Sequence, residues 1–233
     1  MTKTAVIHQP DFLSYLGFFH RLLHAELFVI LDCAQYVDGT RNAWMNRDKI
    51  KTPQGEKWLT VSVKRPPHGT PINEIELSNQ HDWRADNLNL IRENYRVAPF
   101  FGEIFPSLEQ LYSHPCDKLI QFNLKSIELL MDLFDIRIEM QLASTLRPNG
   151  RKNDLLVDIL QKAGATHYLS GAGARAYFEP APFERANILV LWQNFTHPIY
   201  PQLHGAFVPN LSSIDLLFNC GIARSRELLR DCT

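Results

Sequence analysis

Residue types that carry acid–base chemistry follow the first apolar segment of the chain. His8, Gln9 and Asp11 come directly after the apolar residues 5–7, so an imidazole, an amide and a carboxylate would meet at the end of one strand. Histidine has an unperturbed pKa near ~6.5, which suits His8 to act as a general base or as a donor to an oxyanion. The structural alternative is a strand-end histidine that bonds only to the backbone. The polar residues further along the chain favour the functional interpretation.

A second group of polar residues follows the next apolar segment, residues 26–31. Asp32 ends that segment, and its carboxylate would orient the His8 ring or bind a ligand hydroxyl. Asn46 and Arg47 would hold a carboxylate or a phosphate in a fork of donors. The expected pocket is surrounded by His8, Gln9, Asp32, Asn46 and Arg47, with His8 and Asp32 as the catalytic pair. Further substrate-binding residues in this region would be Asp11, Trp44, Lys49 and Lys64.

A small-residue loop follows a later apolar segment. Ser170 and Gly171 open the sequence SGAG, and Arg175 comes shortly after it. If the loop joins a strand to a helix, its backbone N–H groups and Arg175 would bind a phosphate or carboxylate. The loop does not match G-x-G-x-x-G or a Walker loop. Small residues also allow a helix to pack close to a sheet, which is the structural alternative.

The proline-rich segment 197–210 contains two further ligand candidates, His197 and Gln202. Prolines restrict the segment and so lower the entropy lost when its polar side chains hold a ligand. A purely structural role for the segment is an equal alternative. Asn210, Ser212 and Asp215 are expected to cap or begin the helix that follows.

No metal site is expected. His20 and His24 are four residues apart, as zinc ligands on one helix can be, but no third ligand follows at a suitable spacing. They are better explained as surface residues beside an apolar helix face. Cys33 follows Asp32, and a neighbouring acid weakens a thiol as a nucleophile. Cysteine catalysis is therefore not expected.

Composition excludes several classes of partner. The chain has 233 residues, of which 45% are hydrophobic, and its 24 basic and 25 acidic residues give a formal charge of −1. This balance predicts neither nucleic-acid binding nor attraction to an acidic membrane. No apolar run approaches the ~20 residues of a membrane span. The four cysteines lack C-x-x-C spacing and no signal peptide is apparent, so a reducing cytoplasmic location is expected.

Hydrophobic periodicity predicts one α/β domain over residues 1–233. Apolar segments near 5–10, 26–36, 136–146, 166–170 and 188–195 read as strands, and helical patterns separate them. Residues 82–134 show helical spacing alone and are expected to form a helical insertion. Strands that alternate with helices indicate a three-layer α/β fold with a mainly parallel, Rossmann-like sheet. The opening strand, helix and strand are also compatible with a nucleotidyltransferase-like fold.

Four blocks of the chain resemble the WbqC-like proteins, which are encoded in bacterial surface-polysaccharide (O-antigen) gene clusters. The blocks are IHQPDFLSYLGFFHRLLHAELFVILD, WMNRDKIKTPQGEKWLTVSV, YLSGAGARAYF and HPIYPQLHGAFVPNLSSIDLLFNCG. Two positions, Ser14 and Cys33, depart from the family pattern, where a proline and an acid or amide are usual. The resemblance implies an enzyme that forms or transfers an amide or acyl group, including an aminoacyl group, on a nucleotide-linked amino sugar.

Three function classes follow. The favoured one is an acyl or aminoacyl transferase or an amide-forming ligase whose partner is a small nucleotide-linked sugar. It requires no resident cofactor, although ATP or an acyl donor would act as a co-substrate. The His-x-Gly-His signature of nucleotidyltransferases is absent. The alternatives are a non-catalytic sugar-nucleotide binding or assembly protein, and a hydrolase or glycosyltransferase with Asp11 or Asp32 as acid or base. No paired carboxylate spacing favours the last class.

Overall fold

A parallel sheet forms the centre of the molecule in the computed structural model, which describes residues 2–37 and 43–232. Within this part of the chain the sheet has five strands in the order β5-β2-β1-β6-β7. Their bounds are Thr4–His8 (β1), Leu27–Ile30 (β2), Glu139–Leu142 (β5), His167–Ser170 (β6) and Leu189–Trp192 (β7). Every neighbouring pair in this sheet is parallel. The predicted parallel sheet is confirmed.

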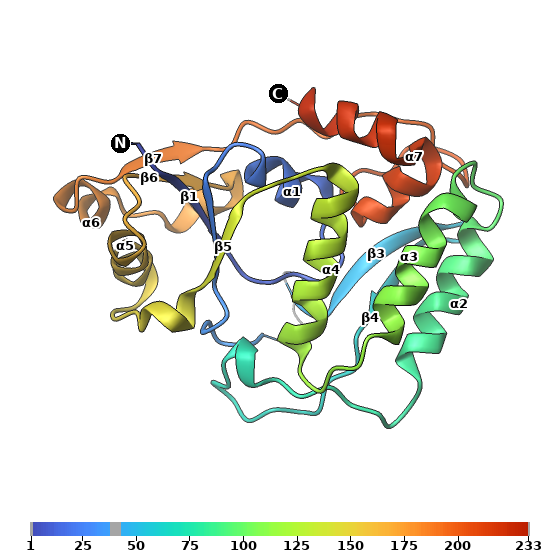
Figure 1. Ribbon diagram of the computed structural model, residues 1–233, viewed down its shortest axis with the longest axis horizontal. Coiled ribbons are helices and arrows are strands. Elements are labelled where there is room, and N and C mark those ends of the chain that lie inside the picture. Colours follow the sequence, from blue (N-terminus) through green and yellow to red (C-terminus); the bar gives the residue numbers. More distant parts are fainter. Residues whose placement is uncertain (1, 38–42, 233) are drawn as a thin grey trace.

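Alternating side chains bury both faces of the sheet, as parallel sheets require. On β1, Ala5 and Ile7 pack into one core and Val6 packs into the other. Helices α5 (Lys152–Lys162) and α6 (Pro180–Arg185) cover the first face. The other face is covered by α1 (Leu16–Leu22), α4 (Leu119–Phe134) and α7 (Ser213–Arg230). The three layers are visible in Figure 1 and confirm the expected architecture.

The larger core extends beyond the sheet to a hairpin and two more helices. Strands β3 (Arg47–Thr52) and β4 (Gly55–Thr60) pair antiparallel in a separate sheet. Helices α2 (Trp83–Tyr95) and α3 (Phe101–Ser113) pack near this hairpin, on the far side of α4 from the main sheet (Figure 1). Residues 82–134 are thus helical, and their apolar side chains belong to the same buried cluster as Val6 of β1.

Two helices have features that the sequence patterns did not show. The small-residue loop leads into a short 3₁₀ helix, η3 (Ala172–Tyr177), rather than an α-helix; the other short 3₁₀ helices are η1 (Ile72–Glu74) and η2 (Ala143–Leu146). The last helix, α7, continues to Arg230 and has a break at Gly221, where φ is 72°. A Cβ at Gly221 would lie 2.6 Å from the Phe100 ring, so this glycine permits a tight contact as well as the break.

The chain order of the strands creates a crevice beside β1. From β1 the sheet extends through β2 to β5 on one side and through β6 to β7 on the other. In open α/β sheets, ligands bind at such a switch point, outside the carboxyl ends of the strands. These ends are His8 on β1, Ser170 on β6 and Trp192 on β7.

Candidate functional site

Two adjoining cavities lie at the carboxyl edge of the sheet. The first has a volume of about 480 Å³, and residues around the ends of β1, β6 and β7 line it, with others from α1, α5 and η3. The second has a volume of about 410 Å³ and is lined by His8, Asp11, Ser14, Tyr15, Trp44, Asp48 and Asn210. His8 and Tyr15 line both cavities. A ligand that occupies both would therefore pass these two side chains.

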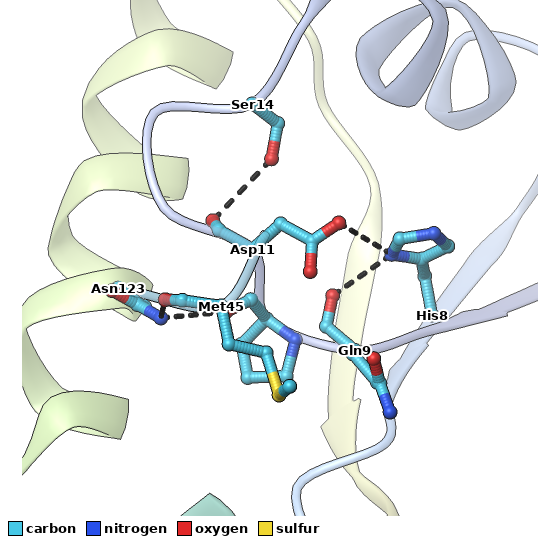
Figure 2. Close-up of polar contacts among 7 residues, drawn as sticks. His8, Gln9, Asp11, Ser14, Met45 and Asn123 are labelled. Carbon is cyan, nitrogen blue, oxygen red and sulfur yellow. Dashed lines mark hydrogen bonds and ion pairs between the residues drawn. The ribbon is translucent and has the colours of Figure 1, made fainter. Parts of the chain in front are cut away.

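The His8 ring points toward the carboxylate of Asp11, as Figure 2 shows. Its Nδ1 lies 2.9 Å from the Gln9 carbonyl oxygen and 3.5 Å from Asp11 Oδ2. A bond to a carbonyl requires a proton on Nδ1, so Nε2 of the neutral ring carries a lone pair. The ring edge also packs against Phe18 at a centroid distance of 5.2 Å. His8 is thus held in one orientation and one tautomer.

Burial shifts the two titratable groups in opposite directions. The pKa of His8 is lowered to about 3, first by burial and then by the charge of Arg21. The pKa of Asp11 is raised to about 7, because burial disfavours the carboxylate more than Arg21 favours it. Burial is the largest cause of both shifts, so His8 is neutral and Asp11 titrates near neutral pH. Asp11 therefore has the pKa that proton transfer at neutral pH requires.

Asn123 of α4 joins the loop after β1 to the segment before β3. Its Nδ2 donates to the carbonyl oxygens of Pro10 and Met45, at 2.6 Å each (Figure 2). The Phe12 backbone N–H also donates to the Trp44 carbonyl at 3.0 Å. These bonds bring Asp11 and the start of the hairpin to the same cavity.

Asp48 is a site residue that the sequence interpretation missed. It is buried, lines the second cavity, and has a pKa well above the usual range, because of burial and then the neighbouring Asp11 charge. Side chains alternate along a strand, and on β3 Arg47 and Lys49 both lie against the Trp58 ring instead. The alternation of side chains along β3 was the available signal in the sequence, because it places Asp48 on the opposite side of the strand from Arg47 and Lys49.

Arg21 is the second missed residue. It lies in the last turn of α1, is 5% exposed and lines the first cavity. Within the described residues its guanidinium forms no ion pair, and its buried Nε has no hydrogen-bond partner. Arg21 follows Phe18 by three positions, which places it on the buried face of the helix. That spacing was the available signal, but a charged residue near a helix end is usually exposed.

Asp32 does not orient His8, which corrects the first expectation for the catalytic pair. Its carboxylate is buried and accepts bonds from the Ser144 N–H at 2.9 Å, the Ser144 hydroxyl at 2.6 Å and Asn73 Nδ2 at 3.1 Å. These partners tie β2 to η2 and to the η1 region. Asp32 lines neither cavity, so its place in the structure is that of a connector between loops.

In the structure, the expected pocket of five residues does not include the two residues from the hairpin region, Asn46 and Arg47. Asn46 donates to the Val61 carbonyl at 3.2 Å, and Arg47 donates to the Ala43 carbonyl at 3.3 Å and lies 4.4 Å from the Trp58 ring. Neither residue lines a cavity with His8. The other two basic candidates form ion pairs outside both cavities, Lys49 with Glu56 and Lys64 with Glu76. The hairpin is a separate sheet, and among the described residues of β3 and β4 Asp48 is the one that lines either cavity.

One part of the small-residue loop lines the first cavity, and Arg175 shortly after the loop lies at the surface. Ser170 and Gly171 line the first cavity, as does Gln9. A Cβ at Gly171 would lie 3.1 Å from Arg21 Nη1, so glycine leaves room for the guanidinium. Arg175 is exposed, lies 4.7 Å from the Trp192 ring and is outside the cavity. The extended turn into η3 directs Arg175 away from the anion position that it was expected to fill.

The two candidates in segment 197–210 belong to a buried network instead. Gln202 Nε2 donates to the Asp215 carboxylate at 2.9 Å, and Lys51 Nζ donates to Gln202 Oε1 at 3.1 Å. His197 packs among the rings of Phe195, Tyr200 and Phe207, with Nδ1 on the Pro198 carbonyl. Neither His197 nor Gln202 lines either cavity. Asp215 lies in the first turn of α7, as expected, and its carboxylate accepts bonds from buried side-chain donors.

His20 and His24 contact each other and not a third ligand. Their Nε2 atoms are 3.3 Å apart, and His20 also bonds to the Cys232 carbonyl and to Gln193. His20 is buried rather than at the surface, which corrects that part of the interpretation. No cluster of three or more His, Cys, Asp or Glu side chains suited to a metal ion occurs in residues 2–37 and 43–232.

Comparison with known proteins identifies the family. The model of the WbqC-like protein family matches residues 9–227. The chain belongs to the WbqC-like protein family. An uncharacterized protein of Mycobacterium tuberculosis is 30% identical to this WbqC-like protein over 234 residues, which covers 100% of this chain and 99% of the relative. No solved structure matches it.

The family match includes Asp11, Arg21 and Asp48, the groups that the two cavities bring together. Among the described residues of this WbqC-like protein, none of the helices combines the length and apolar character needed to cross a membrane. Cys33, Cys116, Cys220 and Cys232 are free thiols.

The opposite pKa shifts in this WbqC-like protein predict how its stability depends on pH. Between pH ~4 and ~6.5 the unfolded chain binds a proton on His8 and none on Asp11, whereas the folded chain binds one on Asp11 and none on His8. The proton counts are equal, so the pair contributes no slope in that window. Asp11→Asn removes the compensation, and the unfolding free energy should then rise with pH by at most ~1.4 kcal/mol per unit relative to wild type.

His8→Asn is the matched variant, and the slope of its unfolding free energy against pH should have the opposite sign. Asp11 keeps its proton in the folded state up to about pH 7, so the stability of His8→Asn should fall as pH rises from ~4 to ~7. Urea unfolding at pH 4.5, 5.5 and 6.5 measures both slopes against wild type. Equal slopes in all three proteins would contradict the assigned shifts.

Proposed function

We propose that this WbqC-like protein is a cytoplasmic enzyme of bacterial surface-polysaccharide (O-antigen) synthesis. It forms or transfers an amide or acyl group, including an aminoacyl group, on a nucleotide-linked amino sugar. The observation that carries the proposal is Asp11, a buried carboxyl with a pKa raised to about 7, which opens into a cavity beside the fixed ring of His8. Family membership is consistent with this role.

Asp11 accepts the proton in the proposed reaction. The sugar amine lies in the second cavity and attacks the acyl carbon, so that a C–N bond forms. The bond between that carbon and its leaving group breaks, and the leaving group departs with the electron pair. The proton lost from nitrogen passes to the Asp11 carboxylate. His8 Nε2 accepts a hydrogen bond from the amine, because the pKa of His8, about 3, leaves the ring unprotonated but weakly basic.

A second candidate is a hydrolase or glycosyltransferase, and the placement of two carboxyl groups in one cavity favours it. Asp11 and Asp48 both line the second cavity. Burial and the Asp11 charge raise the pKa of Asp48 well above its usual range, which would suit a general acid that works with a carboxylate base. In this reaction Asp48 donates to the leaving-group oxygen while Asp11 acts on the attacking group.

Product analysis tests these functions. The purified full chain would be incubated with a panel of nucleotide-linked amino sugars and acyl donors, with and without ATP, and products would be identified by mass. An acyl or aminoacyl mass added to the sugar supports the proposed transferase. Release of free nucleotide and sugar supports the hydrolase. Saturable binding of a nucleotide sugar with no product from any donor would favour a non-catalytic binding protein.

A further inference from the structure

The two cavities have opposite electrostatic character. Among the described residues that line the first cavity, Arg21 is the only basic residue of the lysine or arginine type, and none is an aspartate or glutamate. The second cavity has the reverse composition, because the described residues that line it include Asp11 and Asp48 and no lysine or arginine. A ligand that spans both would therefore place an anionic group in the first and a neutral or cationic polar group in the second.

Arg21 is a buried cation that forms no ion pair with another described residue. It is 5% exposed, its Nε has no partner, and no ion pair to it occurs within the described residues. A buried unpaired charge is costly, and an arrangement of this kind becomes favourable when an anion supplies the missing hydrogen bonds. The planar fork of arginine matches the oxygens of phosphate and carboxylate groups.

Tyr177 gives the first cavity an exposed aromatic wall. Its side chain is 70% exposed although it lines the cavity, so it lies at the mouth rather than in the core. The Tyr177 carbonyl accepts a bond from Asn153 Nδ2 at 3.2 Å, and the next residue, Phe178, packs on Trp192. The backbone beneath the ring is therefore anchored. An exposed aromatic face of this kind stacks with nucleobases.

We propose that the first cavity binds a nucleoside diphosphate, with the diphosphate on Arg21 and the nucleobase stacked on Tyr177. Gly171 allows the phosphate site to form, because a side chain there would crowd Arg21 Nη1. The inference rests on the proposed function, since it assigns the nucleotide of the nucleotide-linked sugar to the first cavity. The sugar then extends past His8 and Tyr15 into the second cavity.

Equilibrium binding to the full chain tests the two contacts separately. Pyrophosphate probes the Arg21 contact, and uridine, guanosine and thymidine diphosphates probe both contacts. Arg21→Met should weaken pyrophosphate and the best nucleoside diphosphate by about 10- to 100-fold, because each loses charge-assisted bonds. Tyr177→Ala should weaken only the nucleoside diphosphate, by about tenfold, through lost stacking.

Arg175→Met is the matched control. Arg175 belongs to the same loop as Gly171, but its guanidinium lies on Trp192 outside the cavity, so affinities should stay at the wild-type value. Arg21→Met should also leave the thermal midpoint unchanged or higher, because it removes an unpaired buried charge. A merely structural arginine would lower the midpoint instead. Gly171→Val provides an independent variant that displaces the guanidinium and should weaken pyrophosphate similarly.

Three results would overturn the assignment. One is wild-type affinity for pyrophosphate in both Arg21→Met and Gly171→Val. The second is an equal loss of pyrophosphate and nucleotide binding in Tyr177→Ala. The third is binding of acetate or glycine that depends on Arg21 with no binding of pyrophosphate, which would assign the cavity to a carboxylate. The expected binding pattern without any transfer product would instead reject the proposed function and leave the nucleotide site intact.

Discussion

Asp11→Asn is expected to lower turnover by ~10²–10⁴-fold, the usual contribution of a positioned general base. The amide has nearly the same shape as the carboxyl, and the carboxyl is protonated in about half of the molecules at neutral pH. The fold and the affinity for substrate should therefore stay close to wild type. In the wild type, kcat/KM should rise with pH through about 7, because only ionised Asp11 accepts a proton and kcat/KM reports the free enzyme.

Asp48→Asn separates the two catalytic candidates. Burial and the Asp11 charge raise the pKa of Asp48 well above its usual range, which favours the protonated carboxyl. In the transferase Asp48 takes no part in the proton transfer, and turnover of Asp48→Asn should stay within about tenfold of wild type. In the hydrolase it removes the general acid, and the loss should approach that of Asp11→Asn.

His8→Asn tests the assignment that the sequence favoured. If His8 accepts the proton, this variant should show a loss of ~10²–10⁴-fold and lose the rising limb of the pH profile. If Asp11 is the base, the limb near pH 7 should remain in His8→Asn and disappear in Asp11→Asn. Asp11→Asn with wild-type turnover and profile would remove Asp11 from the mechanism.

Asp215→Ala is expected to destabilise the fold by ~3–5 kcal/mol, the cost of breaking a buried charged network. Its carboxylate accepts bonds from the hydroxyls of Tyr95 and Tyr200, at 2.7 Å and 2.8 Å, and from Gln202 Nε2. Removal leaves these buried donors unpaired, and each costs the desolvation of its polar group. The buried ammonium of Lys51 also bonds to Gln202 and would lose a nearby counter-charge.

Urea unfolding at constant pH measures this effect. Tyr200→Phe removes one donor and keeps the carboxylate, so it should cost only ~1 kcal/mol. Asp132→Ala is the surface control, because Asp132 pairs with Arg137 where both side chains are exposed, and such pairs contribute ~0–1 kcal/mol. Asp215 lines neither cavity, so ligand affinity should be preserved in molecules that fold. A loss below ~1 kcal/mol for Asp215→Ala would show that the network does not stabilise the fold.

The sequence by itself determined the elements and the layers. Apolar segments of strand length alternated with amphipathic helices, and this local periodicity is enough to predict a parallel sheet covered on both faces. It also predicted that His8, Ser170 and Gly171 follow strands, and all three line the first cavity. These predictions depend only on the order and spacing of residues along the chain, so they do not require knowledge of the tertiary contacts.

Only the tertiary structure decided which polar side chains share a cavity. Residue type favoured Arg47 and Lys49 over Asp48 as site residues. The hairpin packs as a separate sheet, and because side chains alternate along β3, Asp48 is the one of these three residues that faces the second cavity. Arg21 was overlooked because a charged residue near a helix end is usually exposed, although its spacing from Phe18 indicates the buried face of the helix. Asp32 follows its strand as predicted, but its carboxylate accepts hydrogen bonds from Ser144 and Asn73, which belong to distant segments of the chain. Periodicity reports which face of an element is apolar, whereas the direction of a polar side chain depends on partners that are far away in the sequence.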